Sequence, residues 1–403
     1  MTLAVDSLRR RTLDWLSTMA AGGPGEYRLH AAAEPTPFAS CFAAFLRHLF
    51  GDLDALAPAD RAAWVTRLQQ LQRQDSGLFV DDSNDRRATD ALHDADHLNF
   101  QLTSFCLGAL HALGARPVHP LRCTEAWTPD GIRRRLDALD WSQPWNSGNK
   151  AMFLGICLAY AATHGGEARA GATLEAWFDW HDAHQNPDTG FWGDGFRARY
   201  IDGLGGAYHQ FTVYNYMGRP VRHHQRIIDR TLMLQQPDGM YSPYLGGMTC
   251  YELDAVDVLV HLYARHDYRR AEIEASLRRT LDAVASAWNA DGGFCWGRRR
   301  AFRGGDWLRL LGGAASHRDP AYLYLSARAA LSTYTSRHAV LRNGWSRAPR
   351  GWHDSSIFDT WFRCVTIAEI AAVVPHTPYS GMGWQPLDVP GLGWFRLPAP
   401  AAA

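Results

Sequence analysis

The chain has 403 residues and 41 Lys or Arg against 41 Asp or Glu, so its formal net charge is zero. Hydrophobic residues make up 46% and charged residues 20%, which excludes a disordered chain and a collagen-like or coiled-coil fibre. A neutral chain is also not expected to bind nucleic acid, because dedicated nucleic-acid binders are usually basic. Length alone allows two or three domains.

The seven cysteines are scattered and form no C-x-x-C pair, so we expect reduced thiols rather than a disulfide scaffold or a zinc ribbon. The N-terminal segment carries charges where a signal peptide needs an apolar run. The longest apolar stretch, residues 152–162, is too short to span a bilayer, which argues against stable membrane insertion. These features predict a soluble, cytoplasmic protein.

Helical patterns follow one another along the chain. Residues 1–55 predict an N-terminal helical layer, and apolar residues recur at three- and four-residue intervals in 168–184, 222–235 and 271–288. Other helical segments are largely apolar, at 105–113, 153–162 and 258–263. An amphipathic helix that alternates with an apolar one predicts an outer and an inner ring of helices.

A short repeat closes several of the amphipathic helices. Its copies begin at Gln74, Gln185, Gln236 and Asn289, and each continues to a glycine followed by an aromatic residue. With two weaker copies the repeat spacing averages about 53 residues, close to the periods that indicate repeat architecture. Each glycine is predicted to end its helix in a left-handed turn, and each aromatic side chain to fill the gap between neighbouring repeats.

Six such helix pairs predict an all-α fold, an (α/α)6 toroid that forms a single domain over residues 1–376. We expect the fifth inner helix to be the short piece at 306–311. Residues 297–352 form a basic insertion with 11 arginines and two acids, a charge of +9 against −9 for the rest. It is interpreted as a lid that attracts a small anionic substrate, or alternatively as a surface loop paired with acidic neighbours. The Pro- and Gly-rich residues 377–403 predict an irregular C-terminal flap.

Polar residues at the starts of the inner helices are expected to converge on one mouth of a central cavity. The strongest candidates lie in residues 250–261, where Cys250, Asp254, Asp257 and His261 share one face of an otherwise apolar helix. Carboxylates in such surroundings are costly unless they line a wet cavity or are paired. The functional interpretation makes Asp254 and Asp257 an acid–base pair with one raised pKa; the structural one makes them helix caps and bridges between repeats.

Other candidates are spread over the remaining inner helices. His209 and Tyr214 form a possible base and acid, although aromatic packing explains Tyr214 equally well. Asp359 and Arg363 have the spacing of a structural ion pair. His93 and His97 could share a metal, but no third ligand is evident, so neither a metal nor another cofactor is predicted. The candidate substrate-binding residues are Asp96, His97, Asn149, Lys150 (the only lysine), Tyr251, Arg347, Asp359, Trp361 and Arg363.

Over roughly residues 60–375 the chain resembles the superfamily of terpenoid cyclases and protein prenyltransferases. The repeat that includes residues 236–241 looks like a degenerate copy of that superfamily's Q-x-x-x-G-x-W repeats, and Glu252-Leu-Asp254-Ala255 stands where the cyclases carry D-x-D-D. Ala255 departs from the motif, and Phe362 occupies an expected zinc-ligand position of the prenyltransferases, so the resemblance implies no zinc here.

The resemblance implies an isoprenoid-processing enzyme that cyclises or transfers a prenyl-type substrate. Asp254 would protonate an alkene or epoxide with support from Glu252 or Asp257. Aromatic faces such as Tyr208, Tyr251 and Trp361 would stabilise the cation that forms.

Two other function classes stay open at this point. Carbohydrate-active lyases, hydrolases and epimerases use the same toroid, and Asn149, His209, Tyr214 and an arginine would suit proton abstraction beside a uronate carboxylate. A non-catalytic toroid that binds a lipid or a peptide is the third possibility.

Overall fold

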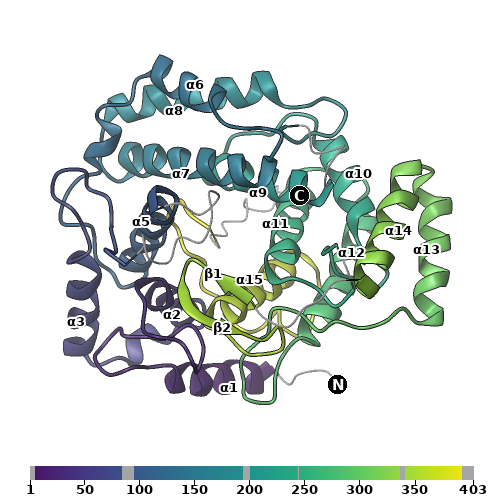
Figure 1. Ribbon diagram of the computed structural model, residues 1–403, viewed down its shortest axis with the longest axis horizontal. Coiled ribbons are helices and arrows are strands. Elements are labelled where there is room, and N and C mark those ends of the chain that lie inside the picture. The colour runs from purple at the N-terminus through teal and green to yellow at the C-terminus, as the bar shows by residue number, and fades with distance from the viewer. Residues whose placement is uncertain (1–4, 84–94, 194–199, 244, 336–340, 393–403) are drawn as a thin grey trace.

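The computed structural model in Figure 1 describes residues 5–83, 95–193, 200–243, 245–335 and 341–392. These residues form 14 α-helices, two short 3-10 helices (Leu53–Ala55 and Arg122–Thr124) and one two-stranded hairpin. The all-α prediction is therefore confirmed.

Six helices contact one another in a closed cycle, visible around the centre of Figure 1. In order they are α2 (Pro37–Leu49), α5 (Ala95–Ala112), α7 (Pro144–Thr163), α9 (Tyr200–Tyr216), α11 (Thr249–Arg265) and α15 (Ile357–Val373), which returns to α2. These are the apolar helices of the chain, and most of their described side chains are buried. Each of these helices is covered by a neighbour on both flanks and by side chains at the centre. This explains why they lack the solvent-facing polar stripe of a surface helix.

The remaining helices lie outside this cycle (Figure 1). They are α1 (Val5–Thr18), α3 (Pro58–Gln69), α6 (Pro129–Asp137), α8 (Ala168–His184), α10 (His224–Leu234), α12 (Arg270–Ala285), α13 (Gly304–His317) and α14 (Pro320–Thr335). The amphipathic segments read at 168–184, 222–235 and 271–288 correspond to α8, α10 and α12. The strands β1 (Leu341–Asn343) and β2 (Ser346–Arg350) pair antiparallel just before α15.

The repeat has a defined hydrogen-bonding role. The Nε2 atom of Gln185 donates to the Gly190 carbonyl of its own turn (2.7 Å) and to the Arg222 carbonyl that precedes the next outer helix (3.1 Å). Gln72 and Gln235 make the equivalent two bonds in their copies. The glutamines that hold these turns are thus Gln72 and Gln235, rather than the Gln74 and Gln236 with which the repeat was expected to begin.

The turn that follows each glutamine has the predicted shape. Gly190 and Gly239 adopt φ of 76° and 90°, the left-handed region that favours glycine. The aromatic residues after the turns, among them Phe79, Tyr241 and Phe294, are fully buried. Each repeat therefore ties one outer helix to the next and places one ring in the core between them.

We expect Gln185→Ala to lower the free energy of unfolding by about 1–3 kcal/mol, because two buried carbonyls lose their donor. Urea denaturation of the variant measures the change. Gln70→Ala removes an exposed glutamine and is expected to stay within about 0.5 kcal/mol of the parent protein. Equal effects of the two substitutions would contradict this role of the repeat.

The structure corrects the expected architecture in two places. α2 belongs to the closed cycle, so residues 1–55 are not simply an additional helical layer. Residues 306–311 do not form an inner helix: they lie in α13, where Leu308 is 72% exposed, and the fifth member of the cycle is α11. Sequence pattern could not separate these cases, because α2 and α13 are both short helices with many apolar residues.

The basic insertion and the tail also take specific positions. α13 and α14 form a helical hairpin that contacts α10, whereas β1 and β2 lie beside the centre of the molecule (Figure 1). Residues 377–392 of the tail are irregular, as predicted. The backbone N–H of Gln385 donates to the carbonyl of Leu49 (3.0 Å). The tail beyond residue 392 lies outside the described residues, as does His93.

Candidate functional site

A cavity of about 220 Å³ lies inside the cycle of helices. Side chains from α5, α7, α9, α11 and α15 line it, mostly from their N-terminal halves, as expected for polar helix starts that converge. The aromatic part of the wall consists of Phe105, Trp145, Tyr208, Trp296, Trp345, Phe358 and Phe362. The polar part consists of His97, Gln101, Asn149, His209, Asp254 and Arg350.

Asp254 is the carboxylic acid of this wall, and it is 2% exposed. Its Oδ2 atom has no hydrogen-bond partner among the residues that the structure describes. Burial raises its pKa well above the ordinary value, and the charges of Asp257 and Glu252 raise it further. Both effects favour the protonated, neutral form of Asp254 at the cavity wall.

Gly205 of α9 makes room for this acid. A Cβ atom at Gly205 would lie 2.1 Å from the Trp145 ring and 3.2 Å from the Oδ2 atom of Asp254. Any side chain there would displace the indole ring. The close approach of the α9 backbone thus places an aromatic face directly beside the acid.

Asp257 lies one turn further along α11 and does not line the cavity. It is buried, its Oδ2 atom is 3.5 Å from the Nδ1 atom of His261, and it interacts electrostatically with Glu369 of α15. Burial raises the pKa of both, and the neighbouring Asp257 raises that of Glu369 further.

Sequence reasoning missed Glu369. The only signal is that it stands alone among apolar residues near the end of the last inner helix. Its position beside Asp257 places a second acid–acid contact behind Asp254.

We expect the free energy of unfolding to decrease less with rising pH in the Glu369→Gln variant than in the parent protein. The pKa of Glu369 is higher in the folded than in the unfolded chain, so above about pH 4 the unfolded state releases a proton that the folded state retains. The free energy of unfolding must then fall as pH rises through this range. Glutamine keeps the shape of the protonated acid without titrating, so the variant gains stability over the parent progressively between pH 4 and pH 8.

Thermal unfolding of both proteins across that range measures the difference. Glu125→Gln changes an exposed acid and serves as the control, with a curve parallel to that of the parent protein. A Glu369→Gln curve that is also parallel would show that Glu369 does not titrate as argued.

Arg350, the last residue of β2, is the arginine of the cavity wall. It is 5% exposed, its Nη2 atom is 2.5 Å from the Oδ2 atom of Asp359, and its Nη1 atom donates to the Asp354 carbonyl. Its buried Nε atom has no hydrogen-bond partner in the described part of the chain. The predicted Arg347 is instead exposed three residues earlier, where its backbone N–H donates to Glu34. Asp359 does not reach the cavity but holds Arg350 in place.

His209 and Asn149 are further polar groups of the wall. Burial lowers the pKa of His209 to about 3, so its imidazole is uncharged near pH 7, and its Nδ1 atom has no hydrogen-bond partner among the described residues. Asn149 donates to the Trp145 carbonyl (3.2 Å), and the Trp145 ring meets that of His209 edge to face at 5.5 Å. His97 and Asn149 thus lie at the cavity as predicted, together with His209.

Glu252 is buried but has a structural role. It accepts hydrogen bonds from the backbone N–H groups of Tyr241 (3.2 Å) and Met248 (3.0 Å). Thr103 and Thr360 accept the corresponding N–H of the repeat aromatic residue in two other copies. Glu252 therefore holds a repeat turn and does not line the cavity, although its charge contributes to the raised pKa of Asp254.

Arg363 is fully buried behind the cavity wall. It donates to the carbonyls of Cys295 (3.1 Å) and Trp296 (2.6 Å) and pairs with Glu252 at 3.4 Å. The expected pair between Asp359 and Arg363 does not form, because each finds a partner on another segment. Arg363 thus fixes the segment that carries Trp296 rather than binding a ligand.

Tyr214 also lies away from the cavity, because its side chain points outward from α9 to α8. Its hydroxyl donates to the Oδ1 atom of Asp182 (2.6 Å), and its ring packs edge to face on Phe178 at 4.8 Å. The predicted pairing of His209 with Tyr214 is therefore wrong. A spacing of five residues turns the two side chains to different faces of one helix.

Four other predicted binding residues do not line the cavity either. Trp361 is buried behind the wall and stacks on Phe42 at 5.3 Å. Tyr251 packs on the cavity-lining Trp145, with ring centroids 4.9 Å apart. Lys150 is half-buried and Asp96 is exposed.

The described residues contain no group of three or more His, Cys, Asp or Glu side chains arranged to hold a metal ion. Among the same residues, every helix is too short or too polar to cross a bilayer. The sequence matches no known protein-family model, and no curated protein is significantly similar to it. The interpretation of the site therefore depends on its own geometry.

Proposed function

We propose that this protein is an isoprenoid-processing enzyme that starts its reaction by protonating an alkene or epoxide in the central cavity. The observation that carries the proposal is a neutral, buried Asp254 that faces a wall of seven aromatic rings. The closed cycle of α2, α5, α7, α9, α11 and α15, with other helices outside it, supports an (α/α)6 toroid around this cavity. The resemblance of Asp254 to the proton-donating aspartate of the cyclases supports the same chemistry.

The first step transfers one proton. The carboxyl proton of Asp254 forms a new C–H bond with the π electrons of the alkene, or an O–H bond with the epoxide oxygen while one C–O bond of the epoxide breaks. Either step leaves a carboxylate and a carbocation. The faces of Trp145 and Tyr208 stabilise that cation through their quadrupoles. Few water molecules reach such a wall, which protects the cation from premature capture.

The last step removes one proton. His209 is neutral and lies in the same wall, so it is suited to accept a proton from the carbon next to the cation and to form the product alkene. One proton enters and one leaves, so the net reaction on an alkene is an isomerisation or cyclisation. Once the product has left, solvent that enters the cavity returns the proton from His209 to Asp254.

The cavity volume favours a small substrate or the reacting end of a longer one. A cavity of about 220 Å³ has room for on the order of ten carbon atoms, since an apolar cavity of about 150 Å³ holds benzene. Arg350 adds a place for an anionic group at one side of the wall.

The proposal is tested by incubating the protein in D2O with ten- and fifteen-carbon acyclic isoprenoid alkenes and their epoxides. Mass spectrometry should show a rearranged skeleton, with one non-exchangeable deuterium per turnover from an alkene and none from an epoxide, because the new O–D bond of the latter exchanges with water. Absence of any rearranged or deuterated product with these compounds contradicts the proposal.

A carbohydrate-active enzyme is the second candidate, favoured by the presence of Arg350, Asn149 and His209 around tryptophan rings that could stack on a sugar. Its weakness is the position of Tyr214, which was to serve as the acid but bonds Asp182 instead. Growth of ultraviolet absorbance at an unsaturated uronate product, with no reaction of isoprenoids, would select this candidate. Retention of an unchanged ligand would select a non-catalytic binding protein.

A further inference from the structure

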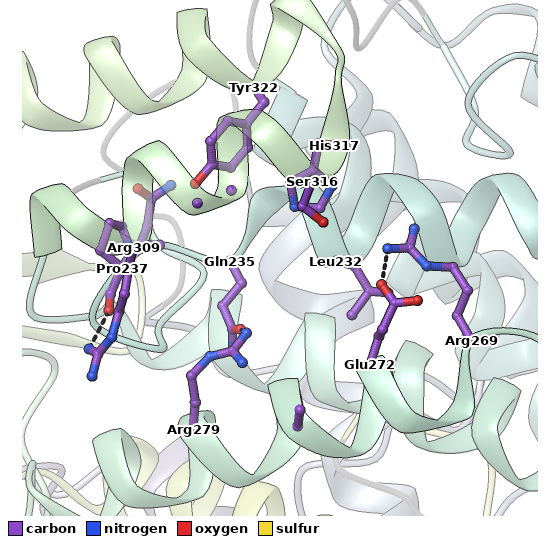
Figure 2. Close-up of a pocket in the computed structure, with 14 residues that line it drawn as sticks. Leu232, Gln235, Pro237, Arg269, Glu272, Arg279, Arg309, Ser316, His317 and Tyr322 are labelled. Atoms are coloured by element: carbon purple, nitrogen blue, oxygen red, sulfur yellow. Dashed lines mark hydrogen bonds and ion pairs between the residues drawn. The ribbon is translucent and has the colours of Figure 1, made fainter.

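In the helical hairpin of α13 and α14, polar side chains of α13 face the rest of the protein, whereas the inward face of α14 is mixed, with Tyr322, Ser326, Ala329 and Thr333 buried. Figure 2 shows a cavity of about 370 Å³ between this hairpin and the helices α10 and α12. Arg309, Ser316 and His317 of α13 line it, opposite Gln235 and Arg279. Arg309 also donates to the Pro237 carbonyl (2.9 Å) across this contact.

The outer side of the hairpin is apolar. Of the seven large hydrophobic side chains that are exposed in the described residues, six belong to this hairpin, with exposed fractions of 48–72%. They are Trp307, Leu308, Leu311, Leu323, Tyr324 and Leu331. Trp307, Leu308 and Leu311 share one face of α13, and Leu323, Tyr324 and Leu331 share one face of α14. The exposed apolar side chains therefore form a stripe along the outer face of each helix.

This arrangement reverses the usual amphipathic pattern. A helix at the surface of a globular protein normally buries its apolar stripe against the core and presents polar residues to water. Here polar groups of α13 face the protein, and both helices carry exposed large apolar side chains on the outside. An exposed apolar surface of this kind marks a binding surface for another apolar phase or partner.

The exposed charges of the hairpin are all positive. Arg303, Arg309 and Arg318 are exposed, with Arg303 just before α13 and Arg318 in the turn between the helices. The only acids in residues 301–335 are Asp306 and Asp319. Arg300 pairs with Asp306 and Arg230 with Asp319, which neutralises both.

We propose that this hairpin binds the surface of an anionic lipid bilayer. The apolar stripe lies in the interface between headgroups and acyl chains, and the arginines contact the acidic headgroups, so the hairpin lies on the membrane without crossing it. A lipid surface fits better than a second copy of the chain, because two-fold pairing of this face would bring like charges together. It also fits better than a protein partner, since the stripe residues line none of the cavities beside the hairpin into which an anchor residue would insert. The inference does not depend on the proposed reaction.

Flotation of the full chain with lipid vesicles tests the proposal. We expect binding to vesicles of phosphatidylcholine mixed three to one with phosphatidylglycerol, and weaker binding to phosphatidylcholine alone. The triple variant Leu308→Ser, Leu311→Ser, Leu331→Ser should lower the partition coefficient at least about tenfold. Arg303→Glu with Arg318→Glu should lower it by about tenfold or more on the anionic vesicles only.

Two matched variants control for general surface effects. Val118→Ser removes the seventh exposed hydrophobic side chain, and Arg134→Glu reverses an exposed charge on α6, so neither should change vesicle binding. The proposal is overturned if the parent protein does not float with anionic vesicles, or if the controls weaken binding as much as the hairpin variants do. A dimer in sedimentation velocity that the triple serine variant dissociates, without vesicle binding, would assign the face to a second copy instead.

Discussion

Asp254→Asn is expected to reduce turnover by about 100- to 10,000-fold, the range that a positioned general acid contributes. Asparagine has the size of the protonated carboxyl group but no acidic proton to deliver. Because Asp254 is neutral in the folded protein, the substitution should leave the fold intact. Rates of product formation, with thermal unfolding of the same preparation, measure both effects.

The pH dependence of the reaction gives a second readout of the same group. Activity should fall as pH rises through the raised pKa of Asp254, since only the protonated form can donate. Asp96→Asn is the matched control, because Asp96 begins the neighbouring helix α5 but is exposed. Full activity of the Asp254→Asn variant would show that Asp254 is not the general acid.

Arg363→Met is expected to lower the free energy of unfolding by about 3–5 kcal/mol, the typical cost of removing one partner of a buried ion pair. The variant leaves the carboxylate of Glu252 and the carbonyls of Cys295 and Trp296 without their buried donor. Methionine fills a similar volume, so the loss reflects the missing polar contacts more than a cavity. Urea denaturation monitored by circular dichroism measures it.

Adding Glu252→Gln to Arg363→Met should recover part of that loss, because the buried charge that was left unpaired is removed as well. Arg347→Met, which alters an exposed arginine, should change stability by less than about 0.5 kcal/mol. A loss below about 1 kcal/mol for Arg363→Met would show that this pair is not a main support of the cavity wall.

The short repeat shows how far sequence patterns carry the prediction of structure. Glycine turns and buried aromatic residues follow from neighbours a few positions apart, so the turns at Gly190 and Gly239 were predictable. The glutamine that holds each turn was assigned one or two positions away in two copies. Its distant partners are the carbonyls of His119 and Ser276, 47 and 41 residues further along the chain, and spacing alone does not determine that distance.

The candidate site divides in the same way. Helical spacing placed Asp254 and Asp257 on one face, yet only the packing of α9 and α15 decides that Asp254 reaches the cavity while Asp257 meets Glu369. Arg347 and Arg350 lie three residues apart in one hairpin, and the sequence pattern does not show which of them reaches the cavity. In the folded protein the Arg350 side chain lines the cavity wall, where it pairs with Asp359.

Sequence by itself determined the helical content, the turn chemistry and the presence of an acid on an apolar helix, because these depend on spacings of a few residues. Tertiary structure alone decided that α2 joins the cycle, which side chains form the cavity wall, and that α13 and α14 expose their apolar side. The zero net charge likewise includes one arginine-rich segment, residues 297–352. In the folded protein its arginines lie in different places, with Arg350 at the cavity and Arg303 and Arg318 on the outer hairpin. The wall brings together residues as distant as His97 and Phe362, and such contacts arise only when the whole cycle closes.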